Sequence, residues 1–276
     1  MTTLFSRHLT PARRDERVRE AARKLASARG RNWSSLLEGH RGRHMIHHHG
    51  TPVTPREMLY RMRGCNFCVA MSDPRDLDVA LAIGQIVMGD SGAFTAFLNG
   101  ASVNWDAYFA WLRPWLRPPH WAVAPDVIGG DVNVQRDALR LWPFPRRLAG
   151  AVWHIHLPLD YLRELANEWP RVCFGSSGAL WQLGTDAWRA RLDRAWNILG
   201  AMHDPPPVHM LRGMYHASEG PWPFASADSV NVARNFKCME RDPAQMAREI
   251  DGRNPPASAW VQRPEQRDML CSFGTK

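Results

Sequence analysis

A single (β/α)8 barrel is the fold that this 276-residue sequence predicts, with a basic helical extension at its N-terminus. Eight short segments are almost continuously apolar, as strands are when both faces of a parallel sheet are covered. Helical patterns separate several of these segments, and eight strand–helix units are what a closed parallel barrel requires. A doubly wound sheet is the alternative, but no GxGxxG turn follows any of the eight segments.

The expected elements follow one another along residues 45–276, which we interpret as one barrel domain with a C-terminal tail. Strands are expected at 45–50 (MIHHHG), 65–71 (CNFCVAM), 85–90 (QIVMGD), 121–126 (WAVAPD), 149–156 (AGAVWHIH), 171–178 (RVCFGSSG), 207–213 (PVHMLRG) and 227–233 (ADSVNVA). Helices are expected at 55–63, 105–116, 133–142, 159–169 and 185–202.

Residues 1–44 are interpreted as a basic helical extension. Apolar residues recur there at helical spacing, and arginines that include Arg13, Arg14 and Arg17 cover the other faces. Eleven Lys and Arg residues against four acidic ones give 11 − 4 = +7, nearly all of the net charge of +8. Such an excess favours a polyanionic partner, because phosphate contacts release counterions. Packing on the outside of the barrel is the alternative role for this segment.

The bulk composition is that of an ordinary globular protein, with 45% apolar and 22% charged residues. No apolar run is long enough to span a bilayer, and the N-terminus is too charged for a signal peptide, so we expect no membrane contact and a cytoplasmic location. The five cysteines, an odd number, argue against a disulfide framework. Cys65 and Cys68 have CxxC spacing, but no second pair follows, and buried thiols are the simpler interpretation.

Polar groups stand at the C-terminal end of almost every expected strand. The leading candidates for chemistry are Asp90, Asp126 and Asp228, each at or next to a strand end. In a barrel these ends converge on one face, where active sites are built. Each aspartate taken alone is equally well explained as a helix N-cap. Several together, from separate segments, favour a catalytic site. His49, at the end of the first strand, is also expected near this site.

Seven motifs occur in an order that resembles the tRNA-guanine transglycosylase superfamily, and most closely its DNA branch, the DNA 7-deazaguanine transglycosylases of phages and bacteria. They are HGTP (49–52), DSGAF (90–94), PDVIGGD (125–131), VWHIH (152–156), FGSSG (174–178), HMLRG (209–213) and ADSVNVARN (227–235). The resemblance covers about residues 45–236. It implies exchange of a guanine in DNA for a 7-deazaguanine base such as 7-cyano-7-deazaguanine, without a cofactor, in the host cytoplasm if the chain is phage-encoded.

The resemblance also implies a role for each part of the site. Asp228 would be the nucleophile that holds a covalent sugar intermediate, and Asp90 would transfer protons. Asp126 would read the Watson–Crick edge of guanine. The remaining base-binding residues would be Ser91, Gly92, His154, His156, Gly175, Ser176, Ser177 and Gly178. The nucleic acid would contact Arg212, Asn231, Arg234 and Asn235, together with Arg13, Arg14 and Arg17.

The sequence departs from the tRNA enzymes at three places. His154 stands where they carry a glutamine, and Thr95 replaces the glutamine that follows DSGGF in them. Their CxCxxC zinc motif is missing, since Cys238 is the only cysteine in that region, so we expect no zinc. Three alternatives stay open: an N-glycosidase that removes a base without replacing it, a tRNA-guanine transglycosylase, and a non-catalytic DNA-binding barrel.

Overall fold

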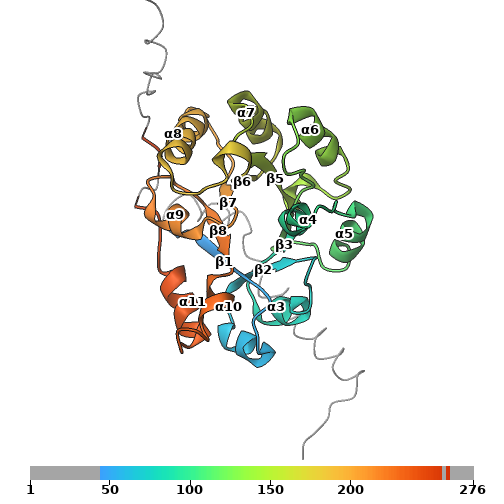
Figure 1. Ribbon diagram of the computed structural model, residues 1–276, viewed down its shortest axis with the longest axis vertical. Helices are drawn as coiled ribbons and strands as arrows, with labels where there is room; N and C mark the ends of the chain where they lie inside the picture. The colour runs from blue at the N-terminus through green and yellow to red at the C-terminus, as the bar shows by residue number, and fades with distance from the viewer. Residues whose placement is uncertain (1–43, 257–258, 262–276) are drawn as a thin grey trace, which may run out of the picture. The chain divides into compact units, whose positions relative to one another are not determined.

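The computed structural model describes residues 44–256 and 259–261, and in this part the chain forms a closed barrel of parallel strands (Figure 1). The strands follow one another around the barrel in sequence order, β1 to β8, and β8 pairs with β1 to close it. Their bounds are β1 Ile46–Gly50, β2 Asn66–Ala70, β3 Val87–Asp90, β4 Trp121–Val123, β5 Ala149–His154, β6 Val172–Gly175, β7 Val208–Met210 and β8 Ser226–Ser229. The predicted (β/α)8 fold is therefore confirmed.

Helices surround the ring of strands (Figure 1). The α-helices are α3 Leu77–Ile83, α4 Ala93–Leu98, α5 Trp105–Leu112, α6 Val132–Arg140, α7 Leu159–Glu168, α8 Asp186–Gly200, α9 Met214–Glu219, α10 Asn231–Asn235 and α11 Pro243–Asp251. The 3-10 helices are η2 Arg56–Met62, η3 Arg146–Leu148 and η4 Gly178–Leu180. The four helices expected from residue 105 to residue 202 correspond to α5, α6, α7 and α8.

Two expectations need correction. The segment 55–63 forms a 3-10 helix and not an α-helix. The last strand ends at Ser229, and the second half of the segment 227–233 belongs to α10. Val230 and Val232 would share one face of a strand, but Val230 is exposed and Val232 is buried. Burying Val232 against the core therefore requires the helix.

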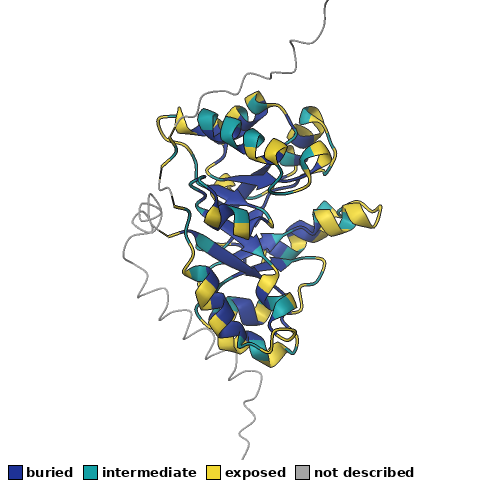
Figure 2. Ribbon diagram, turned by 60° about the vertical axis from the view of Figure 1, so that its left-hand side comes forward, coloured by how far each residue is buried: buried dark blue, intermediate teal, exposed yellow. Residues whose placement is uncertain are grey.

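The strands are the buried part of the molecule, and the outer faces of the helices are exposed (Figure 2). A small cluster inside the barrel includes Cys68, Met88 and Trp121, separate from the large core between strands and helices. The rings of His48 and His209 make edge contacts with each other and with Trp121. The barrel interior is thus partly polar directly beneath the strand ends.

The basic extension, with Arg13, Arg14 and Arg17, lies outside the described residues, as does most of the C-terminal tail. Among the described helices, none combines the length and apolar character needed to cross a membrane.

Candidate active site at the carboxyl ends of the strands

Asp228 lies on β8 and is 5% exposed. Its Oδ1 accepts a hydrogen bond from the backbone N–H of Arg212 at 2.8 Å and lies 3.2 Å from Nε2 of His209. An ionised carboxylate only accepts, so His209 carries its proton on Nε2, and its Nδ1 accepts from the hydroxyl of Ser226 at 2.8 Å. Burial lowers the pKa of His209, which keeps the ring neutral. Both hydrogen bonds that Asp228 accepts within the described chain use Oδ1, and neither uses Oδ2.

Asp90 ends β3 and is only partly exposed. Its Oδ1 accepts from the backbone N–H of Gly92 at 2.6 Å, in a tight turn. Gly92 has φ +77°, and a Cβ there would lie 3.0 Å from Ser72, so the turn requires glycine. Burial raises the pKa of Asp90 to about 6, and the negative charges of Asp228 and Asp126 add to this effect. Asp90 is thus a carboxyl that exchanges protons near neutral pH.

Asp126 follows β4 and is 8% exposed. It is not a helix cap, because the side chain of Asp131 caps α6 by accepting from the N–H of Val134 at 3.0 Å. Oδ2 of Asp126 lies 3.2 Å from Nε2 of His154, an ion-pair distance without full hydrogen-bond geometry. The hydroxyl of Tyr108 bonds to the carbonyls of Gly89 and Val123 and ties together the two strands that carry Asp90 and Asp126.

His154 and His156 meet at one hydroxyl. Oγ of Ser177 lies 3.0 Å from Nδ1 of His154 and 3.2 Å from Nδ1 of His156. If Nε2 of His154 carries the proton toward Asp126, Ser177 donates to His154 and accepts from His156. Gly178, with φ +58°, leaves room for the His156 ring, because a Cβ there would lie 3.0 Å from it. A polar chain therefore runs from the half-buried His156 to Asp126.

Ser91 and the serines of the glycine-rich turn are also at this face. Ser91 is 3% exposed, and its hydroxyl accepts from the N–H of Ala93 at 3.2 Å. Ser176 accepts from the indole N–H of Trp188 at 2.9 Å, so its hydroxyl has a structural partner. Gly175 ends β6, the strand that runs beside His154 of β5. The predicted base-binding residues thus come from four neighbouring strands of the barrel, β3 to β6.

Arg212 lies within the aspartate cluster. Its backbone has φ +55°, unusual for a residue other than glycine, and this turn aims its N–H at Asp228. Its guanidinium lies 3.5 Å from the ring centre of Phe94. The positive charge of Arg212 counters the rise in the pKa of Asp90. Besides any contact with nucleic acid, Arg212 balances the charge of the carboxylates.

Helix α4, seen end-on in Figure 1, directly follows Asp90 and contains no buried residue (Figure 2). Phe97 is 52% exposed and Leu98 is 66% exposed. An apolar projection beside a polar site is typical of a surface that contacts a ligand or partner.

Other predicted residues lie on α10 and on β1. Asn231, Arg234 and Asn235 lie on α10, where Asn231 and Arg234 are exposed and Asn235 is partly buried. The expectation that His49 lies near the site is wrong, since its ring faces outward and bonds to Asp251 of α11 at 2.9 Å. Side chains alternate along a strand, so His48 takes the inward position instead.

Sequence reasoning missed His209 and Ser226 as partners of Asp228. A signal was present: His209 is a polar residue within the apolar segment PVHMLRG, and such a residue requires a buried partner. The partner itself, on the next strand, is visible only once the barrel register is known.

Comparisons of the chain with models of protein families, with curated proteins and with solved structures find no match. The fold is a closed parallel barrel, an architecture found mostly in enzymes and compatible with many unrelated reactions at this face.

Proposed function

We propose that this protein is a DNA-guanine transglycosylase that replaces guanine with a 7-deazaguanine base through a covalent Asp228–sugar intermediate. The observation that carries the proposal is the contrast between two neighbouring carboxyls. Asp228 accepts two hydrogen bonds on one oxygen, whereas burial raises the pKa of Asp90 to about 6. A nucleophile and a proton-transfer group with different environments are what glycosidic chemistry needs.

In the proposed reaction, Oδ2 of Asp228 attacks the anomeric carbon of the target nucleotide. The bond between this carbon and N9 of guanine breaks, its electron pair goes to the base, and protonated Asp90 gives the leaving base a proton. The incoming base then loses its N9 proton to Asp90 and attacks the same carbon, which releases Asp228. Protons and bonds balance over the cycle, so no external acid, oxidant or reductant is required.

Recognition of the base is assigned to Asp126 and the polar chain behind it. Guanine and 7-deazaguanine both present N1–H and the N2 amino group as donors, which a carboxylate accepts. Asp126 is nearly buried, and His154 holds only one of its oxygens. Ser177 fixes His154 in turn. Leaving such donors unpaired in a buried site is costly, so this arrangement favours guanine-like bases.

A polynucleotide substrate is supported by charge and by α4. The chain carries +8, concentrated before residue 45. Phe97 and Leu98 are exposed on α4, the helix that follows Asp90, and exposed apolar side chains can stack on or wedge between bases. A paired guanine must leave the duplex to reach the aspartates, and unstacking by such a projection lowers the energy needed.

The experiment is to incubate DNA with the protein and 7-cyano-7-deazaguanine, digest the DNA, and identify the nucleosides by mass spectrometry. The proposal predicts a new 7-deazaguanine nucleoside, and no such product with Asp90→Asn. Abasic sites without the new nucleoside would identify an N-glycosidase instead. Modification of tRNA but not DNA would place the protein in the tRNA branch. DNA binding without any chemistry would leave a non-catalytic barrel.

A further inference from the structure

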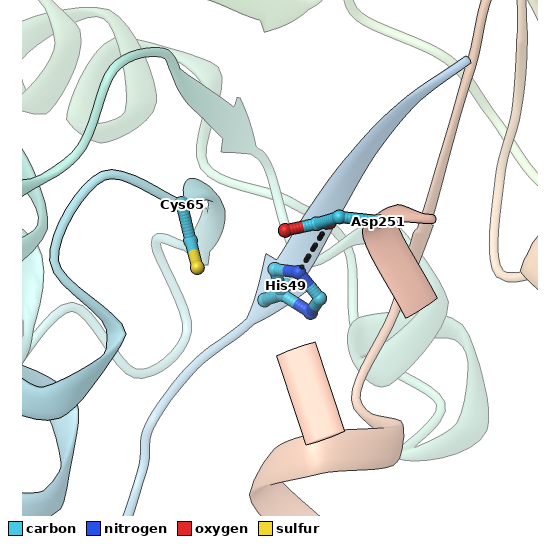
Figure 3. Close-up of side chains that lie close together, drawn as sticks. All are labelled: His49, Cys65 and Asp251. Carbon is cyan, nitrogen blue, oxygen red and sulfur yellow. Dashed lines mark hydrogen bonds and ion pairs between the residues drawn. The ribbon is translucent and has the colours of Figure 1, made fainter. Parts of the chain in front are cut away.

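Three potential metal ligands meet on the outer side of the barrel, away from the aspartates. His49 comes from β1, Cys65 from the residue before β2, and Asp251 is the last residue of α11 (Figure 3). One ligand atom from each lies within 4.8 Å of the other two. His49 is 1% exposed and Cys65 is 8% exposed, whereas the Asp251 side chain is 36% exposed. The cluster is therefore buried on two sides and open to solvent on the third.

One ring nitrogen of this cluster lacks a partner within the described part of the chain. Nε2 of His49 bonds to Oδ1 of Asp251 at 2.9 Å, but its Nδ1 is buried without a partner in the described part of the chain. The Cys65 thiol is buried and lies beside the Asp251 carboxylate in the same cluster.

The donor set and its spacing suit zinc. A nitrogen, a thiolate and a carboxylate are the ligands that Zn²⁺ takes, and three protein ligands with one open position are a common arrangement. With Zn–S about 2.3 Å and Zn–N or Zn–O about 2.0–2.1 Å, tetrahedral ligand atoms lie roughly 3.3–3.6 Å apart. The 2.9 Å His49–Asp251 pair must open slightly, and a pair at the 4.8 Å limit must close by about 1 Å.

We infer that His49, Cys65 and Asp251 form a zinc site whose fourth position is taken by water. The fourth ligand enters beside Asp251, the most exposed of the three. Bound zinc would join α11 to β1 and to the residue before β2, which lie far from α11 in the sequence. Bound zinc would also stabilise β1, which carries His48. The ring of His48 contacts His209, the residue that bonds to Asp228. The expectation of a zinc-free protein considered cysteine motifs only, and this cluster contains a single cysteine.

The test uses the full-length protein, freed of metal by a chelator and then titrated with Zn²⁺ or with Co²⁺ as a spectroscopic probe. We expect one equivalent of zinc to remain after dialysis and the melting temperature to rise by several degrees. Co²⁺ should give a thiolate charge-transfer band and the visible absorption of a four-coordinate ion. Cys65→Ser should abolish the charge-transfer band, and Asp251→Asn should weaken metal binding at least tenfold.

Cys238→Ser is the matched control, because Cys238 is an exposed cysteine away from the cluster, and it should bind metal as the unaltered protein does. Asp251→Asn changes a partly exposed side chain and is expected to fold even if Cys65→Ser does not. A folded protein that retains no zinc and gives no thiolate band with Co²⁺ overturns the inference. Metal binding that survives both Cys65→Ser and Asp251→Asn overturns it equally. None of these readouts depends on the proposed base exchange.

Discussion

Nε2 of His209 lies 3.2 Å from Oδ1 of Asp228, and both residues are buried. This contact fixes the proposed nucleophile from inside the barrel, while Ser226 holds the far side of the same ring. Orientation of the carboxylate thus depends on a chain of three side chains from β7 and β8. The same oxygen also accepts from the backbone of Arg212, which leaves the other oxygen for attack.

We predict that His209→Ala lowers kcat for base exchange roughly 10–100-fold, because a hydrogen bond to a charged group contributes about 1.5–3 kcal/mol. KM for the incoming base should change little, since His209 bonds to Asp228 and Ser226 and not to the residues assigned to base recognition. His209→Gln should recover part of kcat by supplying another N–H. Thermal melts are needed beside the kinetics, because His209 is fully buried. An unchanged kcat in folded His209→Ala would remove His209 from this role.

Asp126→Ala should weaken binding of the free base by about 1–3 kcal/mol, because donors on the base lose their acceptor. Asp131→Ala is the control from the same loop. It removes the cap of α6 and should cost about 0.5–2 kcal/mol of stability without affecting base binding. Calorimetric titration with guanine and thermal unfolding distinguish the two effects. Equal base affinity in both variants would show that Asp126 has only a structural role.

Two adjacent serines provide a second matched pair. Ser177→Ala cuts the link between His156 and His154 and should weaken base binding several-fold, with a changed dependence on pH. Ser176→Ala should instead leave the indole N–H of Trp188 unpaired and lower stability by about 1–3 kcal/mol. Base titrations between pH 5.5 and 8 check this. Identical titrations for Ser177→Ala and the unaltered protein would contradict it.

The fold was predictable because each strand is a short apolar run that can be recognised locally. All eight were located, although β4 and β7 are shorter than expected. The change from strand to helix after Ser229 was not predictable, because the sequence SVNVA is compatible with both a strand and a helix. Helix α4 was missed for a different reason: its short sequence, AFTAFL, is almost entirely apolar, so it shows no amphipathic period by which a helix is recognised.

The site was predictable only in part. The gathering of Asp90, Asp126 and Asp228 could be predicted because strand ends converge in any parallel barrel. The side chain that contacts each aspartate depends on register and on which face of the strand it takes. His48 and His49 illustrate the limit, since adjacent residues of identical type point to opposite sides of β1. Asp251, at 202 positions from His49, gives no sequence signal at all.

The raised pKa of Asp90 predicts a stability effect with a definite sign. A carboxyl whose pKa is about 6 in the folded protein and about 4 when unfolded binds its proton more tightly when folded. Folding therefore becomes less favourable as pH rises from about 4 to 6. Asp90→Asn removes this cost, and it should be more stable than the unaltered protein by about 1–3 kcal/mol at pH 7.5.

The difference between these two proteins should nearly vanish near pH 3, where Asp90 is largely protonated in both states. Buried histidines with lowered pKa values, such as His48 and His209, destabilise both proteins equally at acid pH and cancel in the comparison. Denaturant unfolding at the two pH values measures the effect. Lower stability of Asp90→Asn at pH 7.5 would contradict the assigned environment of Asp90.

The most direct test of the account is exchange of labelled guanine into DNA by the unaltered protein and by Asp228→Asn. This reaction needs no assumption about which 7-deazaguanine is the natural base. The unaltered protein should incorporate the label and form a DNA adduct at Asp228 that survives denaturation. Asp228→Asn should fold, bind DNA, and show neither incorporation nor adduct. Substantial incorporation by folded Asp228→Asn would contradict the assignment of Asp228 as the nucleophile, and with it the proposed mechanism.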